Sequence, residues 1–518
     1  MTTIFATPLG RRSLFTGASA LALVAGLPSL GLTQGAAPSS GGDPLLEPET
    51  VTANPDTHRL DVAIDAVYGY YDLNRRPVAL RSYDGGPRPR TLRVRAGDTL
   101  GLKLANRLPS PPPNLAAHGA AAANGHLHHV SAPVPGMTGL NVPHGFNRTN
   151  MHLHGMHVSP RSPADNVLLT VEPGQVQNYS YAIPATHPCG LNFYHAHEHG
   201  SVALQVASGM AGALIVEGKV DGIEGIKGLK DVVMLLQSLP VDAQGQLEQY
   251  ATLDTGTQVY INGQRNPTIR MKRGEVQRWR LVNATHDRFL TLTLAGRPFV
   301  ALGFDGNPLE ETEDHKAIFL APGNRAEFLV QAPEPGSHAL EGGTNFGVAY
   351  GTIATVLVEG EVERPAEPYR GPLVDYAKDF GGHLRPVEDG EIVKGRRVGF
   401  GQVGTLPYWT WTIDGEPFAM DEKGFTAKLG SAEEWVLTNQ TNDPHPFHIH
   451  INPFQVLEAD GLPVPVKPGR WLDTITIPPH GRVRLRTRYV DYDGVYVFHC
   501  HTLVHEDQGM MRLFTVEA

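Results

Sequence analysis

The chain has 518 residues, of which 41% are hydrophobic and 19% charged, and its formal net charge is −10. This length exceeds what one hydrophobic core supports and predicts two to four domains. The acidic balance and the lack of a long basic run argue against nucleic acid as a partner. With only two cysteines, Cys189 and Cys500, a disulfide framework is excluded.

Residues 1–42 are predicted to be an export signal of the twin-arginine type. Arg11 and Arg12 precede an apolar run with small residues, and no acidic residue occurs before Asp43. The alternative is a membrane anchor, but the run is short for a span and is interrupted by Gly26, Pro28 and Gly31. We therefore expect an exported, periplasmic protein whose mature chain has no membrane span.

Three parts of the chain repeat one pattern. It appears in "AGDTLGLKLANRL", "KRGEVQRWRLVNAT" and "KLGSAEEWVLTNQT", where a glycine precedes an asparagine by nine residues each time. The residues between them alternate between apolar and polar, as in a half-buried strand. Such runs, in a chain with 57 glycines and 42 prolines, favour β-sandwiches. We predict three all-β domains near residues 45–220, 221–365 and 366–518.

Residues 109–147 are rich in proline, alanine and glycine and are predicted to form a long surface loop. Its histidines could hold a surface metal, although a solvated loop is the better interpretation; they include His126, His128 and His129. Cys189, in "HPCG", is expected to be a small buried side chain.

Histidines gather in four short motifs, which read in chain order "HLHG", "FYHAH", "HPFHIH" and "HCHTLVHEDQGM". Each contains His-x-His, and residues two apart on a β-strand face the same side. Each motif therefore offers two imidazoles on one face. All four lie in the first and third predicted domains. Their histidines are His152, His154, His195, His197, His445, His448, His450, His499, His501 and His505.

The second domain repeats the framework without these histidines. Its counterpart to "PFHIHI" is "RFLTLT", which puts Leu290 and Leu292 where the third domain has His448 and His450. The histidines are therefore not required by the fold, which favours a role as metal ligands.

The last motif holds one cysteine between two histidines. On a strand, Cys500 would face one side while His499 and His501 face the other. Cys500 could then bind one metal within its own domain, and the two histidines could bind others across a domain boundary. A few covalent bonds would connect the two sites, an arrangement that suits electron transfer.

The cysteine site needs further ligands, and His445, His505 and Met510 are the candidates. Two imidazoles, a thiolate and a distant thioether are the ligand set of a blue-copper centre. Zinc is the competing metal, but its tetrahedral sites seldom include methionine.

In this order the four motifs resemble those of the multicopper oxidases, and the triplication resembles the three-domain members of that family. The resemblance implies three consecutive cupredoxin-like Greek-key β-sandwich domains and four copper ions. The implied type 1 ligands are His445, Cys500, His505 and Met510. The implied type 2 ligands are His152 and His448. The implied type 3 ligands are His154, His195, His197, His450, His499 and His501.

The resemblance also implies a reaction in which four one-electron oxidations of a small-molecule donor are coupled to the four-electron reduction of O2 to water. A laccase-like oxidase of phenols or aromatic amines and a cuprous oxidase in copper tolerance, which would take Cu(I), are the two enzyme alternatives. The latter often carry a methionine-rich segment before "HPFHIH", but residues 366–440 contain only Met420. The ending "HEDQGMM" keeps that alternative open. A copper-sequestering protein is the alternative without turnover.

Two acidic residues are candidates for supplying protons to O2 reduction. Asp165 lies thirteen residues after His152, where the family places an acidic residue, and Glu506 directly follows His505. The alternative is that both are surface acids that cap turns. Asp507 is a weaker candidate. No cofactor other than the metal ions is expected.

Overall fold

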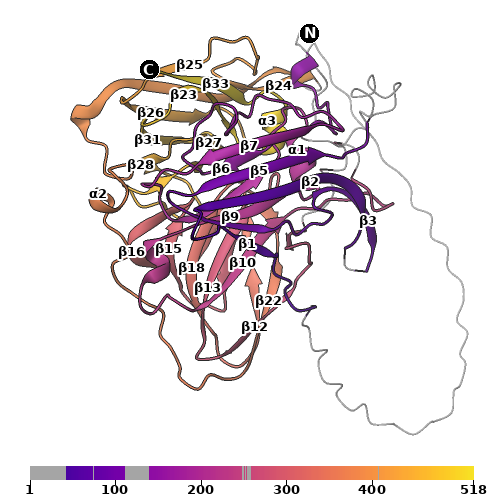
Figure 1. The fold of residues 1–518 in the computed structure, drawn as a ribbon, viewed down its shortest axis with the longest axis vertical. Helices are drawn as coiled ribbons and strands as arrows, with labels where there is room; N and C mark the ends of the chain where they lie inside the picture. The colour runs from indigo at the N-terminus through magenta and orange to yellow at the C-terminus, as the bar shows by residue number, and fades with distance from the viewer. Residues whose placement is uncertain are drawn as a thin grey trace, which may run out of the picture. The chain divides into compact units, whose positions relative to one another are not determined.

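A computed structural model describes residues 42–518 except 74, 111–138, 248–249, 251–252, 254–257 and 406–407. The predicted twin-arginine signal and His126, His128 and His129 of the 109–147 loop lie outside the described residues. Within them the regular structure is almost entirely β-strand, so the predicted all-β class is confirmed (Figure 1). No helix in these ranges is long and apolar enough to cross a membrane.

The first part of the chain forms two sheets, in the strand orders β1-β4-β9-β8-β6 and β3-β2-β5-β7. Their strands are β1 (Thr50–Thr52), β2 (Arg59–Asp72), β3 (Pro77–Tyr83), β4 (Thr91–Arg95), β5 (Thr99–Asn106), β6 (His152–His154), β7 (Val176–Ala182), β8 (Gly190–His195) and β9 (Ala211–Glu217).

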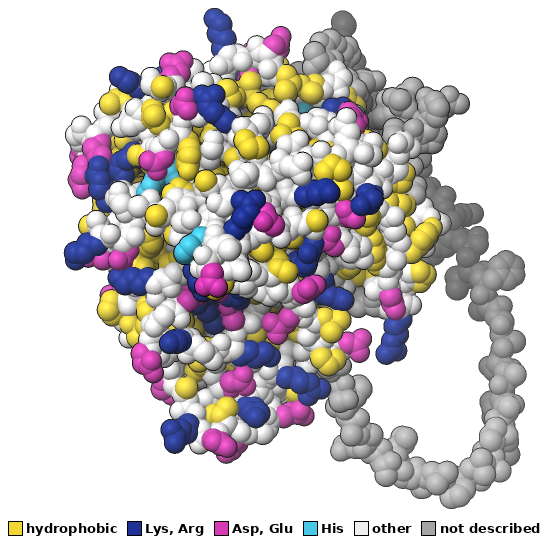
Figure 2. Space-filling model, viewed as in Figure 1, with side chains coloured by type: hydrophobic (Ala, Val, Ile, Leu, Met, Phe, Trp, Pro, Cys, Tyr) yellow, Lys and Arg dark blue, Asp and Glu magenta, His cyan; other side chains and the backbone are white. Residues whose placement is uncertain are grey.

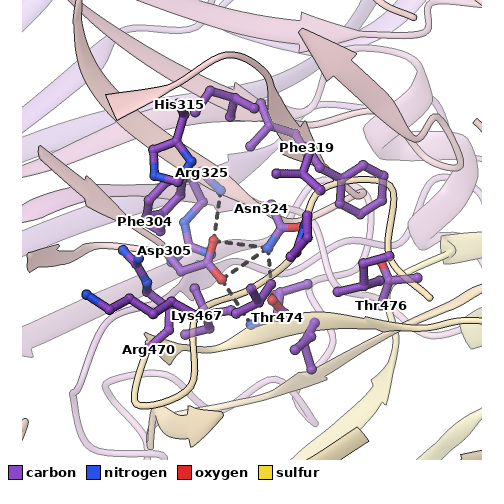
Figure 3. A pocket seen from close by; sticks show the side chains of 18 of the residues that line it. Phe304, Asp305, His315, Phe319, Asn324, Arg325, Lys467, Arg470, Thr474 and Thr476 are labelled. Carbon is purple, nitrogen blue, oxygen red and sulfur yellow. Dashed lines mark hydrogen bonds and ion pairs between the residues drawn. The ribbon is translucent and has the colours of Figure 1, made fainter. Parts of the chain in front are cut away.

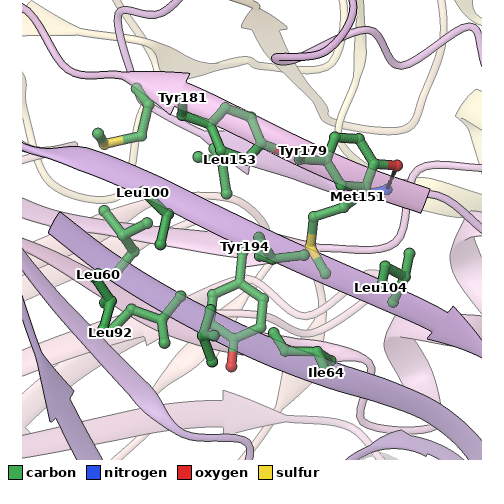
Figure 4. Close-up of a cluster of buried hydrophobic side chains, with 14 of the residues drawn as sticks. Leu60, Ile64, Leu92, Leu100, Leu104, Met151, Leu153, Tyr179, Tyr181 and Tyr194 are labelled. Carbon is green, nitrogen blue, oxygen red and sulfur yellow. Dashed lines mark hydrogen bonds between the residues drawn. The ribbon is translucent and has the colours of Figure 1, made fainter. Parts of the chain in front are cut away.

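The two sheets enclose one hydrophobic core (Figure 4). The start of β2 alternates strictly between exposed and buried residues, so that Leu60 and Ile64 point inward. Leu92 and Leu153 reach the same core from the other sheet, as does the ring of Tyr194. Period-two patterning therefore turns one face of each sheet toward the other.

The second part of the chain forms sheets in the orders β11-β10-β13-β18-β15-β16 and β12-β22-β19-β14-β17, and a two-stranded ribbon of β20 and β21. The strands are β10 (Lys230–Gln237), β11 (Tyr260–Ile261), β12 (Thr268–Arg273), β13 (Val276–Asn283), β14 (Leu290–Leu294), β15 (Phe299–Phe304), β16 (Asn307–His315), β17 (Ile318–Leu320), β18 (Arg325–Gln331), β19 (Gly336–Glu341), β20 (Thr344–Asn345), β21 (Val348–Ala349) and β22 (Thr352–Glu361).

The third part repeats this plan in the orders β24-β23-β26-β31-β28-β29 and β25-β33-β32-β27-β30. The strands are β23 (Ile392–Thr405), β24 (Tyr408–Ile413), β25 (Phe425–Lys428), β26 (Ala432–Asn439), β27 (His445–Ile449), β28 (Phe454–Ala459), β29 (Trp471–Leu472), β30 (Thr474–Ile477), β31 (Arg482–Arg488), β32 (Gly494–Cys500) and β33 (Met511–Glu517). The domain boundaries near 220 and 365 stay a prediction.

The helices in the described ranges are short. They are α1 (Val202–Ala207), α2 (Tyr376–Asp379), α3 (Leu503–Asp507) and the 3-10 turns η1 (Gly139–Asn141), η2 (Lys219–Gly222) and η4 (Asp389–Glu391). α1 and α3 contact each other although they come from the first and third parts of the chain.

Acidic and basic side chains are intermixed over the face in Figure 2, where no patch of one sign dominates.

The repeated asparagines fix how the second and third parts correspond. The side-chain amide of Asn283 donates to the carbonyl oxygen of Leu320 at 2.9 Å. The amide of Asn439 donates to the carbonyl oxygen of Ile477 at 3.2 Å. Leu320 and Ile477 are therefore counterparts.

This correspondence corrects one equivalence drawn from the sequence. Leu290 of β14 pairs with Leu320, and His445 of β27 pairs with its counterpart Ile477. Leu290 therefore stands where His445 stands, and Leu292 stands where Phe447 does, rather than at His448. The segment between Asn283 and β14 differs in length from that between Asn439 and β27, so similar motifs do not align residue by residue.

Candidate metal centre

Eight buried histidines meet where the first and third parts of the chain contact each other. β6 pairs with β8 so that His152 lies opposite His195, and β27 pairs with β32 so that His448 lies opposite His499. The other four follow at alternate positions on or just beyond these strands. They are His154, His197, His450 and His501.

The imidazoles of the two parts interleave. The rings of His152 and His450 stack with centroids 3.8 Å apart, and those of His154 and His448 stack at 3.7 Å. Nε2 of His197, from the first part, lies 3.3 Å from Nε2 of His499, from the third. The cluster therefore exists only when both parts are folded and in contact.

The state of these imidazoles fits metal binding. His152, His195 and His448 each use Nδ1 in a hydrogen bond, while Nε2 has no hydrogen-bond partner among the described residues. A buried nitrogen without a partner is costly, and a metal ion would satisfy it. Burial lowers the pKa of His195 and His197 to about 3, which keeps both neutral. Neutral imidazole is the form that binds metals.

A second group lies inside the third part of the chain. Sγ of Cys500 lies 3.5 Å from Nδ1 of His445 and 3.7 Å from Nδ1 of His505. All three residues are buried, and these ligand atoms form one potential metal group. The backbone carbonyl of Met510 accepts the N–H of Cys500 at 3.0 Å, and Met510 is buried in the same hydrophobic core.

The two groups are adjacent in sequence through β32. Cys500 belongs to the hydrophobic core of the third part, whereas His499 and His501 belong to the histidine cluster. Trp411 lies over the cysteine group, with its ring centroid 3.8 Å from that of His505 and 5.3 Å from that of His445.

Family models described as multicopper oxidase match residues 142–221, 230–361 and 401–518, which together make up more than half of the chain. The chain belongs to the multicopper oxidase family. It is accordingly a copper-dependent oxidoreductase, and the family implies O2 as acceptor and a substrate that donates electrons.

Several known proteins are similar to this multicopper oxidase. A laccase of Haloferax volcanii is 26% identical over 423 residues, covering 76% of this chain and 72% of the laccase. A Staphylococcus aureus protein named multicopper oxidase mco is 27% identical over 377 residues, covering 70% of this chain and 75% of its own. The solved multicopper oxidase of Campylobacter jejuni, described as a metallo-oxidase, has a TM-score of 0.73 at 22% identity and covers 92% of this chain and 96% of its own. This fold match confirms the predicted cupredoxin-like sandwiches.

The two predicted carboxylates both lie beside the histidine cluster and are buried, so neither is a surface acid. Oδ2 of Asp165 accepts from Nδ1 of His152 at 2.8 Å. Oε2 of Glu506 lies 2.9 Å from Nδ1 of His499, and Oε1 lies 3.5 Å from Nδ1 of His197. Burial raises the pKa of Asp165 to about 8 and that of Glu506 to about 7.

Asp507 has a different position. Its carboxylate accepts the backbone N–H groups of Gly200, Val202 and Ala203 at 2.7–3.1 Å, at the start of α1, and also the hydroxyl of Tyr250. It therefore fastens α3 to the first part of the chain, beside Glu506 but directed elsewhere.

A buried ion pair that no sequence motif predicted supports the cluster. Asp473 accepts from Nε2 of His154 at 3.2 Å, and its backbone carbonyl accepts from Nδ1 of His448 at 2.9 Å. Arg325, from the second part of the chain, donates to both oxygens of Asp473 at 2.7 and 2.5 Å. Burial alone would raise the pKa of Asp473. The guanidinium of Arg325 outweighs this and holds that pKa below its usual range.

Asp305 completes this support at the base of a pocket between the second and third parts (Figure 3). The carboxylate of Asp305 accepts the backbone N–H of Arg325 at 2.9 Å and the backbone N–H of Thr474 at 3.2 Å. No motif identifies these residues, because isolated charges beside apolar strands are common at surfaces. Only the contact between the two parts makes them a network.

Proposed function

We propose that the two groups bind four copper ions, one at the cysteine group and three at the histidine cluster. The proposal rests on the convergence of buried, neutral imidazole nitrogens on common points, together with family membership. The type 1 ligands would be His445, Cys500, His505 and Met510. The type 2 ligands would be His152 and His448. The type 3 ligands would be His154, His195, His197, His450, His499 and His501.

Bound copper supplies one-electron redox chemistry at the cysteine group and four electrons for reduction of O2 to water at the cluster. The chain itself provides the connection between them. Cys500 is covalently adjacent to His499 and His501, so an electron that enters beside the thiolate has a short bonded route to the cluster. Both groups are buried, which excludes bulk water from them.

The proposed donors are phenols or aromatic amines, as for a laccase. The stretch before "HPFHIH" has one methionine, Met420, so it offers no cluster of thioethers to bind Cu(I). Beside the cysteine group, the aromatic ring of Trp411 covers the imidazole of His505. The similarity to a protein named laccase supports the same choice.

Asp165 and Glu506 are the proposed proton carriers. Each is a buried carboxylate in contact with a histidine of the cluster, so each can hold a proton close to where O2 is reduced. Asp165 also orients His152, since its two oxygens accept from that imidazole and from the N–H of Leu153. We also propose export through the twin-arginine signal in residues 1–42 and the three domains bounded as predicted.

The test is a comparison of oxygen uptake by the purified, copper-loaded protein with a phenol and with Cu(I). We expect four coppers per chain by metal analysis and faster turnover with the phenol. Faster turnover with Cu(I) would select the cuprous oxidase. One copper per chain, or zinc in place of copper, would contradict the ligand assignment.

A further inference from the structure

Another group of potential metal ligands lies outside the copper centres. His157 follows β6, His383 lies between α2 and β23, and Asp491 lies between β31 and β32. Nε2 of His157 lies 3.1 Å from Oδ2 of Asp491, and Nε2 of His383 lies 3.0 Å from the same oxygen. The two rings are nearly edge to face, with centroids 4.6 Å apart. Two imidazoles and a carboxylate thus converge from three distant segments.

The hydrogen bonds of His157 fix which of its nitrogens has a free lone pair. Nδ1 lies 3.0 Å from the carbonyl oxygen of Ile451, which can only accept, so Nδ1 carries the proton. In a neutral ring Nε2 then presents a lone pair to Asp491, whose carboxylate oxygen is also an acceptor. Two such atoms 3.1 Å apart require a cation between them, either a proton or a metal ion.

Histidines of the copper cluster have the same arrangement. His195 and His448 each point Nδ1 at a backbone carbonyl at 2.9 Å, and they direct Nε2 into the cluster. Metal-binding histidines are commonly oriented by such a bond from the other ring nitrogen. His187 shows the contrast, because its Nε2 accepts the backbone N–H of His157 at 3.0 Å and so has no lone pair left for a metal.

We propose that His157, His383 and Asp491 bind a divalent transition-metal ion, Cu2+ or Zn2+, in addition to the four coppers. Two imidazoles and a carboxylate suit these ions, and the lack of sulfur disfavours Cu(I). Ligand bonds of about 2.0–2.2 Å place neighbouring donors roughly 3.0–3.5 Å apart, close to the separations seen here. The side chain of Asp491 is 48% exposed, so an ion can enter from solvent.

The ion would join three segments that are otherwise far apart in sequence. It would also act close to the copper cluster, because the carbonyl that orients His157 belongs to Ile451, the residue after His450. A bound ion should therefore raise the unfolding temperature of the copper-loaded enzyme.

The test is zinc binding by the full-length, copper-loaded protein, measured by equilibrium dialysis with metal analysis and by calorimetry. Zinc is chosen because it is redox-silent. We expect one zinc per chain beyond the measured copper. His383→Ala and Asp491→Asn should each weaken this binding at least about tenfold and leave copper content and blue absorption unchanged.

The matched control is His58→Ala. His58 also contacts a carboxylate, with Nδ1 3.1 Å from Oδ1 of Asp98, but among the described residues no second imidazole contacts that carboxylate. Its loss should not change zinc binding. No additional zinc in the wild-type protein would mean that the three residues form an ion pair only, and equal binding by wild type and both site variants would place the ion elsewhere. Either result overturns the proposal, independently of the copper count.

Discussion

The second and third parts of the chain build the same pair of sheets and use them differently. β13 and β18 pair in the register of β26 and β31, so Arg325 and Arg482 both begin their strands opposite the residue before the repeated asparagine. The side chain of Arg325 is fully buried and bonds Asp473, whereas that of Arg482 is 64% exposed and pairs with Glu458.

Position within the repeat therefore does not decide the role of a residue. β18 faces another part of the chain, whereas β31 at the same position faces solvent. The second part has Leu290 where the third has His445, and it contributes Arg325, which bonds the Asp473 that contacts His154 and His448. The third part, by contrast, contributes proposed metal ligands of its own.

The largest expected effect comes from removing the soft ligand of the third part. Cys500→Ser should abolish the blue thiolate-to-copper absorption and lower oxidase activity by more than roughly a hundredfold. The histidine cluster should keep its copper, because none of its eight proposed ligands changes. Absorption spectra and metal analysis check this. A variant that stays blue would place the type 1 site elsewhere.

Substitution of Arg325 and of Arg482 tests the difference between the second and third parts. Arg325→Met removes one partner of a fully buried ion pair and should destabilise the protein by about 3–5 kcal/mol. It should also perturb the copper at His154 and His448, which Asp473 positions. Arg482→Met, the matched control, breaks an exposed pair and should cost less than about 1 kcal/mol.

Denaturant unfolding and electron paramagnetic resonance of the copper-loaded variants measure both effects. Equal losses in the two arginine variants would show that burial of Arg325 has no special role. A destabilised Arg325 variant with unchanged copper spectra would limit that residue to folding.

The carboxylates should have a smaller effect, confined to one half of the reaction. Asp165→Asn and Glu506→Gln should keep full copper and slow reoxidation of the reduced enzyme by O2 about 10- to 100-fold, with the larger effect at Asp165. Reduction by substrate should be unchanged. Stopped-flow measurement separates the two half-reactions. Unchanged reoxidation in both variants would leave these residues with a structural role only.

The smallest effect is expected at Met510, the proposed thioether ligand. Met510→Leu keeps two imidazoles and a thiolate, so the centre should stay blue while its reduction potential rises, because a weak donor has been lost. Redox titration gives the answer. No change, or a fall in potential, would remove Met510 from the ligand set.

The all-β class, the repeated strand pattern and the proposed copper ligands were all predictable from the sequence. Alternating apolar residues indicate which face of a strand is buried, and His-x-His indicates two potential ligands on one face. Both signals are local in the sequence. The pairing of Cys500 with two flanking histidines is equally local, since it depends only on the alternation of a strand.

Only the tertiary structure decided what surrounds these ligands. The contact between Arg325 and Asp473 spans 148 residues, and that between His157 and Asp491 spans 334, so no periodicity reports either of them. The register likewise moved the counterpart of Leu290 from His448 to His445, because hydrogen bonds between strands, rather than spacing along the chain, set which residues face each other. Second-layer contacts of this kind are formed by packing between parts of the chain, and a single sequence does not encode them as a motif.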